Sequence, residues 1–283
     1  MSNHFVTGRT SETDSLVNFL RQHSRLTVLT GAGCSTASGI PEYRDDDGNW
    51  MHRRPMQFAD FVGQASRRRR YWAQSYAGWH RISKAKPNAT HYAISDLERS
   101  GKVSCVITQN VDNLHQAAGS RNVIDLHGAL QRIRCLDCGA TDSRNTFQTR
   151  LRDCNPDWDA AVAAISPDGD ARLSVDDFQS FQVPGCSCCG DIVKPHVVFF
   201  GEAVPALRVS RASQFLDQSD ALLVVGSSLM VFSGYRFVRI ASEAGKPIAI
   251  VNRGTTRADD LATHKLTTNC GELLSKTVAR LAA

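Results

Sequence analysis

The stretch TVLTGAGCSTASGIPEYR, residues 27–44, begins like a nucleotide-binding turn and then departs from that pattern. A short apolar run leads into Gly31, Ala32 and Gly33, which is how a buried strand commonly passes into a phosphate-binding loop. Thr36 stands three residues after Gly33, where a third glycine would let a helix pack tightly on the strand. The stretch therefore predicts a dinucleotide site of an unusual kind.

The composition is that of an ordinary globular protein. A chain of 283 residues with 42% hydrophobic content can bury one large domain, or a domain with a smaller insert. No apolar run approaches the roughly 18 to 20 residues that span a bilayer. The N-terminus lacks a charged start followed by an apolar stretch, so we expect no secretion signal. The net charge of +5 is modest, so we interpret the basic run Arg67 to Arg70 as a solvated helix face, with an acidic partner as the alternative. We expect a cytoplasmic protein that binds neither nucleic acid nor membrane.

Short apolar runs alternate with segments of helical length. Ser11 opens an amphipathic segment that predicts a helix before the first strand, and a further helix is expected over Phe232 to Ala244. The predicted strands are Leu26 to Thr30, Val103 to Thr108, Val123 to Leu126, Val197 to Phe200, Ala221 to Val225 and Ile248 to Val251. This alternation predicts an α/β fold with a Rossmann-like parallel sheet covered by helices on both faces.

The pattern changes between residues 133 and 194, where cysteine, Asp, Pro and Gly replace the long apolar runs. We interpret residues 133–194 as a small inserted zinc-ribbon module. Residues 1–132 and 195–283 would then form one nucleotide-binding catalytic domain.

Two Cys-x-x-Cys pairs, each followed by glycine, lie near the two ends of this insert. An x-x spacing lets one tight turn place two sulfurs on a tetrahedral ion, and four thiolates close the coordination sphere. Cys135, Cys138, Cys186 and Cys189 therefore predict one structural zinc, with free buried cysteines as the alternative. Cys188 leaves the second pair ambiguous. We expect that the remaining cysteines do not bind the metal: Cys34, Cys105, Cys154 and Cys270.

Polar residues follow several predicted strands at their carboxyl ends, where parallel sheets bind ligands. Gln109, Asn110 and Asp112 come after Val103 to Thr108 and could bond ribose hydroxyls, although such residues are often only turn and cap formers. His127 follows the next strand and is a candidate general base. Donors to phosphate or ribose follow the later strands: Gly226, Ser227, Ser228, Asn252 and Arg253.

With these motifs together, the chain resembles the sirtuins, which are NAD-consuming protein lysine deacylases. The resemblance covers nearly the whole chain: Gly31 to Ser35, Ser38 to Arg44, Thr108 to His115, His127-Gly128, both cysteine pairs, Val198 to Glu202 and Gly226 to Ser228. The segments RYWAQSYAGWHR, RIRCLDCG and SGYRF, and the long spacer between the cysteine pairs, are similar to the class II branch that includes the mitochondrial lipoamidase type.

The resemblance implies that NAD is a cosubstrate. Tyr43 would shield the reacting sugar face from water. Gln109, Asn110 and Asp112 would hold ribose and nicotinamide, and Asn110 and Asp112 would also take part in catalysis. The residues expected at NAD are Gly31, Ala32, Gly33, Tyr43, Arg44, Gln109, Asn110, Asp112, Gly226, Ser227, Ser228, Asn252, Arg253 and Cys270.

The implied reaction is deacylation. Acetyl-lysine would be the main substrate, and lysines with longer or lipoyl chains are further candidates. The acyl oxygen would attack the ribose carbon as nicotinamide leaves, and His127 would accept a proton relayed from the ribose hydroxyls. The products would be nicotinamide and O-acyl-ADP-ribose. Acyl-lysine peptides would bind as an added strand between Val198–Gly201 and the segment after Leu229.

The resemblance also bears on the acyl group. Branches that remove acidic acyl groups carry a Tyr-x-x-Arg pair, and those positions fall near Ser75 and Gly78 here. No guanidinium would meet a carboxylate there, so we expect succinyl removal to be disfavoured. Small residues beside Tyr76 and Trp79 would leave room for a longer apolar chain.

Three other functions remain open from the residues. The same NAD cleavage could transfer ADP-ribose to a protein side chain. A non-enzymatic NAD sensor would keep the cysteines but make His127 dispensable. A hydride-transferring Rossmann enzyme explains neither Thr36 nor the cysteine pairs.

Overall fold

Six parallel strands form the main sheet, in the order β11-β10-β9-β1-β2-β3. The computed structural model describes residues 11–51, 55–158, 162–165, 170–173 and 178–283. The strands are β1 (Leu26–Thr30), β2 (Val103–Thr108), β3 (Val123–Asp125), β9 (Ala221–Val225), β10 (Ile248–Val251) and β11 (His264–Leu266). Every residue of β1, β9 and β10 is buried, as expected for parallel strands that are covered on both faces.

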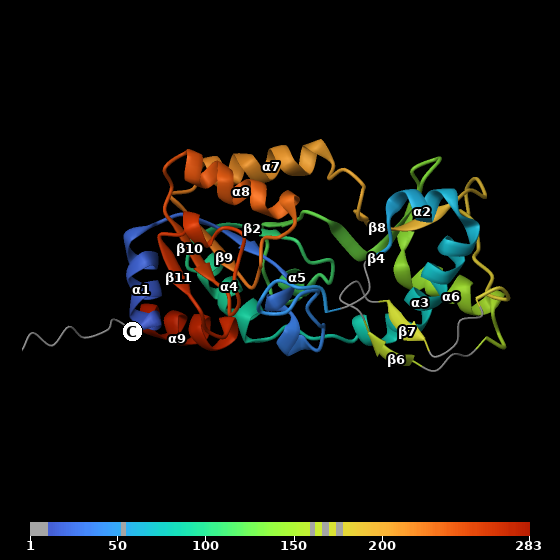
Figure 1. Cartoon of the computed structure of the whole chain (residues 1–283), viewed down its shortest axis with the longest axis horizontal. Coiled ribbons are helices and arrows are strands. Elements are labelled where there is room, and N and C mark those ends of the chain that lie inside the picture. The colour runs from blue at the N-terminus through green and yellow to red at the C-terminus, as the bar shows by residue number, and fades with distance from the viewer. Residues whose placement is uncertain (1–10, 52–54, 159–161, 166–169, 174–177) are drawn as a thin grey trace, which may run out of the picture.

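Helices cover both faces of this sheet, which confirms the predicted fold class (Figure 1). One face carries α7 (Ala206–Asp217) and α8 (Phe232–Glu243), and the other carries α1 (Glu12–Gln22), α4 (Ala89–Arg99) and α9 (Cys270–Ala282). Side chains alternate along β1, so that Val28 packs in the core under α1, α4 and α9 while Leu29 packs under α7 and α8. No helix in the described part of the chain is both long and apolar enough to cross a membrane.

A smaller unit lies beside the main sheet, on the right of Figure 1. It contains the antiparallel sheet β5-β4-β8, formed by Thr141–Ser143, Gly128–Cys135 and Val193–Val197. Around it lie the helices α2 (Phe58–Gly63), α3 (Ala65–Ile82) and α6 (Arg144–Cys154), with a hairpin of β6 (Val162–Ile165) and β7 (Ala171–Leu173). The short helix α5 (Leu114–Ala117) follows β2 in the main unit. The division into 1–132 with 195–283 and an insert of 133–194 stays a prediction.

One predicted strand is wrong. Val197 to Phe200 is not a strand of the parallel sheet, because β8 ends at Val197 and pairs antiparallel with β4. Phe199 is buried against Phe61 and Tyr71, with ring centroids 5.1 and 5.2 Å away, and is not buried between helix layers. An apolar run alone does not distinguish these two kinds of burial.

Smaller differences concern the strand ends and the sheet edge. The third predicted strand ends at Asp125, one residue before the expected Leu126. The edge strand β11 was not predicted, since it has only three residues and two of them, His264 and Lys265, are polar.

Candidate active site

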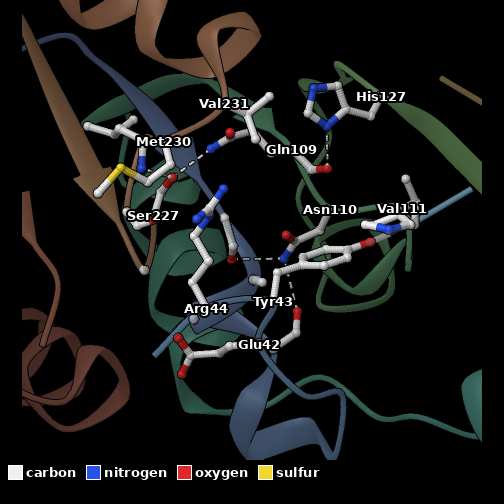
Figure 2. A pocket seen from close by; sticks show the side chains of 18 of the residues that line it. Glu42, Tyr43, Arg44, Gln109, Asn110, Val111, His127, Ser227, Met230 and Val231 are labelled. Atoms are coloured by element: carbon white, nitrogen blue, oxygen red, sulfur yellow. Dashed lines mark hydrogen bonds between the residues drawn. The ribbon is translucent and has the colours of Figure 1, made fainter. Parts of the chain in front are cut away.

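A cavity of about 380 Å³ lies at the carboxyl ends of β1, β2, β9 and β10 and extends to the smaller unit. The structure places every residue predicted for catalysis or NAD along this one cavity: Gly31, Ala32, Gly33, Tyr43, Arg44, Gln109, Asn110, Asp112, His127, Gly226, Ser227, Ser228, Asn252, Arg253 and Cys270. Figure 2 labels six of them, which are Tyr43, Arg44, Gln109, Asn110, His127 and Ser227. Strand ends that are far apart in sequence meet here because the strands are parallel and adjacent.

The loop after β1 packs directly on the loop after β9. A Cβ atom on Gly33 would lie 3.0 Å from Gly226 Cα, and one on Gly226 would lie 2.5 Å from the backbone nitrogen of Cys34. Gly226 also has a φ of +59°, a conformation that favours glycine. The N–H groups of Gly31 and Gly33 donate to Val225 O and Gly226 O at 3.2 and 2.9 Å. These glycines therefore join two strand ends through their own backbone.

Thr36 follows from the same local geometry. Residues Ala32–Cys34 and Thr36–Ser38 form two short 3₁₀ turns in place of a long helix. A third glycine serves close helix-to-strand packing, and no long helix follows Gly33 here. The exposed Thr36 accordingly begins the second turn, and its hydroxyl donates to Gly33 O at 3.2 Å.

A buried polar network holds this loop to the end of β2. The Asn110 amide donates to Gly31 O at 3.0 Å and to Ser35 Oγ at 3.1 Å. Ser35 Oγ in turn donates to the Asp112 carboxylate at 2.7 Å, and that carboxylate also accepts the Leu114 N–H at 2.9 Å. Ser35 lies within the loop motif but was not assigned a function from the sequence. A serine hydroxyl can accept one hydrogen bond and donate another, and this property is the signal that could have indicated that Ser35 links Asn110 to Asp112.

Two buried histidines lie beneath the network. His115 Nε2 is 3.0 Å from Thr30 Oγ1, and the His91 ring is 4.8 Å from the His115 ring between centroids. Burial, with a smaller contribution from the neighbouring His91, lowers the pKa of His115 to about 3, so His115 is neutral at physiological pH. Neither histidine lines the cavity, and both support the loop from behind.

The imidazole of His127 is fixed at both nitrogens. Its Nδ1 lies 2.9 Å from Gln109 O (Figure 2), and because a carbonyl only accepts, Nδ1 carries the hydrogen. Its Nε2 therefore keeps a lone pair and accepts from the Ser233 hydroxyl at 2.7 Å. Sequence reasoning missed Ser233, which is the second residue of α8 and directly follows the segment expected to contact substrate.

Burial lowers the pKa of His127 below its ordinary value. The hydrogen bond to Gln109 O raises this pKa in part, and the positive charge of Arg208 lowers it again. The ring is consequently neutral near pH 7, with an Nε2 lone pair inside the cavity. That is the state required of a general base.

The Tyr43-Arg44 segment forms an aromatic wall of the cavity. The Tyr43 ring meets Trp50 edge-on with centroids 6.2 Å apart, and Trp50 lies 5.9 Å from Phe200. The Arg44 guanidinium stacks 4.1 Å above Trp50 and donates to Gly48 O at 2.6 Å. Arg44 is thus held in place by the wall it belongs to.

The loop after β10 is bound to this wall by charge. Arg253 forms an ion pair with Asp46 at 3.0 Å, and its guanidinium also lies 3.9 Å from Glu42. Burial raises the pKa of Glu42, Arg253 lowers it in part, and Asp46 raises it again. The mostly exposed Arg253 is thereby oriented at the rim of the cavity.

The other end of the cavity is apolar and belongs to the smaller unit. Met56, Tyr71, Leu130 and Phe199 line it. Among the lining residues that the structure describes, the cations are Arg44 and Arg253, which lie on the side of the predicted nucleotide. This end therefore suits an apolar group.

The predicted acyl wall is wrong, because Ser75, Tyr76, Gly78 and Trp79 are not lining residues. Ser75 O accepts from Arg144 at 3.2 Å, the Tyr76 ring packs on Trp158 and Phe181, and Trp79 donates to Asn145 at 2.9 Å. Helix α3 reaches the cavity with Tyr71, which lies about one turn before Ser75. The helical register thus places these side chains beyond the cavity.

The four predicted ligand cysteines meet in the smaller unit. The Sγ atoms of Cys135, Cys138, Cys186 and Cys189 all lie within 4.8 Å of one another. The Cys135–Cys189 and Cys138–Cys186 separations are 3.4 and 3.7 Å, close to the roughly 3.8 Å between ligands of a tetrahedral zinc with bonds of about 2.3 Å. Four thiolates leave no open position, so the set fits a structural zinc.

The local backbone explains the spacing of these ligands. Gly139 and Gly190 adopt φ values of +72° and +81° directly after the second cysteine of each pair. The thiol of Cys188 is not part of the cluster, and its backbone N–H instead points at Cys186 Sγ at 3.4 Å. The second pair is therefore Cys186 with Cys189, as the matching x-x spacing predicted.

Comparisons with known proteins agree with this geometry. The family model described as "Sir2 family" matches residues 31–233. An NAD-dependent protein deacetylase from Bordetella bronchiseptica is 52% identical over 271 residues, which cover 96% of this chain and 99% of that protein. The mitochondrial NAD-dependent protein lipoamidase sirtuin-4 of Bos taurus is 49% identical over 262 residues, covering 92% of this chain and 83% of that protein.

Solved structures share the fold over nearly the whole chain. One described as Sir2 with a p53 peptide and NAD+ has a TM-score of 0.77 at 27% identity, covering 96% of this chain and 99% of that one. Another, from work on the mechanism and regulation of Sir2 enzymes, has a TM-score of 0.74 at 35% identity, covering 95% and 98%.

The cysteine cluster predicts one tightly bound zinc per chain. Cys186→Ser should lose the metal and lower the thermal midpoint by more than about 5 °C, because the two pairs join β4 to β8. Metal content by mass spectrometry and thermal unfolding measure both effects. Cys188→Ser is the matched control and should keep its zinc; loss of metal from this control would contradict the assignment.

Proposed function

Because the chain belongs to the Sir2 family and is an NAD-dependent protein deacetylase, we propose that His127 is its general base and that the cavity holds NAD and the acyl-lysine together. The observation that supports this most is the state of His127. Its Nδ1 is occupied by Gln109 O, and its Nε2 faces the cavity with a lone pair. A neutral imidazole fixed in this tautomer is ready to take a proton.

NAD would lie along the strand ends that carry the polar residues. Ser227 and Ser228 after β9, Asn252 and Arg253 after β10, and Cys270 at the start of α9 would contact the nucleotide. Gly31 and Gly33 would contribute mainly by close packing, because their N–H groups already donate to the end of β9. Ala32 lies between them at the cavity surface.

The reacting part of NAD would lie between Tyr43 and the end of β2. Gln109 lines the cavity, and its amide nitrogen donates to Thr30 O and Ser227 Oγ at 3.1 and 2.8 Å, which fixes the side chain there. Asn110 and Asp112 would bond ribose and nicotinamide, and in the protein alone they position the Gly31–Ser35 loop. The Tyr43 ring would exclude water from the reacting sugar.

The chemistry that NAD supplies is a ribose carbon that accepts the acyl oxygen as nicotinamide departs. The chain's contribution is to hold the two reactants in line and to accept one proton at His127 Nε2. A ribose hydroxyl would replace Ser233 as the donor to this nitrogen. The proton would then sit on an imidazolium whose Nδ1–H remains bonded to Gln109 O.

The substrate peptide would lie between Val198–Gly201 and Met230–Val231, since both segments line the cavity (Figure 2 labels the second). Part of the first segment is already bonded: Val198 N donates to His127 O, Phe199 N to the Glu202 carboxylate, and Phe200 O accepts from Phe58 N. Strand pairing would therefore use the other backbone groups of these segments. Such pairing reads the peptide backbone, so sequence selectivity should be loose.

His127→Ala should lower the deacetylation rate by about 10²- to 10⁴-fold while NAD still binds, because the base is lost and the nucleotide contacts remain. The measurement is mass analysis of an acetyl-lysine peptide and NAD, which also detects O-acetyl-ADP-ribose. His196→Ala is the control, since His196 does not line the cavity. An unimpaired rate in His127→Ala, or ADP-ribose added to the peptide by the unaltered protein, would contradict the proposal.

The pH dependence should show one acid limb from His127. Its pKa is lowered from 6.5 in the folded protein, and the neutral ring is the active form. Activity is then full above this lowered pKa and declines as the pH falls through it. Profiles of kcat/KM for NAD between pH 4.5 and 8 should place the midpoint below 6.5, and a midpoint above 6.5 would be incompatible with a buried neutral base.

The apolar end of the cavity predicts a preference for neutral acyl groups. Acetyl, butyryl and lipoyl peptides should have kcat/KM at least about tenfold above succinyl, because a carboxylate beside Met56, Tyr71 and Leu130 would be desolvated without a partner. The name of the related Bos taurus lipoamidase motivates the lipoyl substrate. Met56→Arg should raise relative succinyl removal by supplying a guanidinium. Faster succinyl than acetyl turnover by the unaltered protein would contradict the assignment of this end of the cavity to neutral acyl groups.

A further inference from the structure

A second hollow adjoins the candidate active site between the starts of α7 and α8. Residues 202–204 and the first turns of α7 line one side, and Ser233 and Arg236 of α8 line the other. Glu202, Val204 and Ser233 line both this hollow and the main cavity. The two spaces are therefore neighbours that share a wall.

Arg236 brings an uncompensated positive charge to this hollow. It makes no ion pair with any carboxylate in the part of the chain that the structure describes, and its Nε is buried without a hydrogen-bond partner. Its guanidinium lies 5.4 Å from the centre of the Phe232 ring, which is 48% exposed. A buried donor without a partner is costly, so an acceptor in the hollow would be favoured.

The carboxylate that lines the hollow does not supply that acceptor, because it already has donors of its own. Glu202 is the acidic residue among those that line the hollow, and Lys194 Nζ donates to its two oxygens at 3.1 and 2.8 Å. The same carboxylate accepts the Phe199 N–H at 2.9 Å. The remaining walls are mostly small, from Ala203, Val204 and Ala206, and leave space for a side chain.

We propose that Arg236 is a specificity-determining residue that binds the carboxylate of an Asp or Glu close to the acyl-lysine in the substrate. This inference rests on the proposed path of the peptide between Val198–Gly201 and Met230–Val231. Glu202 directly follows the first segment and Ser233 lies just beyond the second, so the hollow opens beside that path. An extended peptide advances about 3.3 Å per residue, which brings the side chains within a few positions of the lysine to this wall.

The test compares acetyl-lysine peptides that carry Glu, Gln or Lys at each of the three positions on either side of the acetylated lysine. At saturating NAD, the unaltered protein should prefer Glu to Gln by about three- to tenfold in kcat/KM at one or two positions, as suits a partly exposed charge pair. Arg236→Gln should bring this Glu-to-Gln ratio to about one. Arg236→Glu should make Lys the preferred residue at the same positions.

Arg239→Glu is the matched control on the same helix. Arg239 is exposed, pairs with Glu243 at 2.9 Å and lines neither space, so this variant should keep the Glu preference. Equal use of Glu and Gln at every position, a preference that survives Arg236→Gln, or an equal loss in Arg239→Glu would each overturn the inference.

The reference peptide with Gln at all six positions separates this inference from the proposed function. Its turnover should depend on His127, and this peptide offers no carboxylate to Arg236. His127-independent turnover of this peptide would refute the proposed base, whereas the Glu-to-Gln ratio alone decides the assignment of Arg236.

Discussion

The contact between the loops that follow β1 and β9 is the constraint on which the site depends. Gly33 and Gly226 approach so closely that a Cβ atom at either position would force the neighbouring loop to shift, and two N–H groups of one loop donate to the end of the other strand. This packing fixes the positions of both strand ends relative to the cavity. Asn110 and Asp112 then bind the same loop from β2, so three strand ends become one rigid surface.

The candidate base is positioned by two elements of that surface. Gln109 holds Nδ1 through its backbone carbonyl, and Ser233 meets Nε2 from the first turn of α8. Gly234 allows this approach, because a Cβ atom there would collide with the Gln109 side chain. The tautomer, the orientation and the lowered pKa of His127 thus follow from the packing of α8 against the end of β2.

The smaller unit shapes the apolar end of the cavity through its own core. The guanidinium of Arg144 is almost fully buried, 4.8 Å from the Trp79 ring and 5.4 Å from the Trp72 ring. Trp72 packs on Tyr71, which reaches the cavity beside Phe199. Arg144 begins α6 just after the strand that pairs with β4, the strand ending at the zinc ligand Cys135. The cysteine cluster therefore stabilises the core that supports the cavity wall. It is not part of the reacting site.

Five strands of the parallel sheet, the four cysteine ligands and the polar residues that line the cavity could be predicted from the sequence. These follow from local rules: buried parallel strands are continuous apolar runs, Cys-x-x-Cys is one turn, and ligands collect at the carboxyl ends of parallel strands. Three features could not be predicted in this way: the pairing of Val193–Val197 with β4, the contact of Ser233 with His127, and the cavity residue of α3, which is Tyr71 and not Ser75 or Gly78. Each of these depends on how two elements far apart in the chain pack together, and neither spacing nor periodicity along one element contains that information.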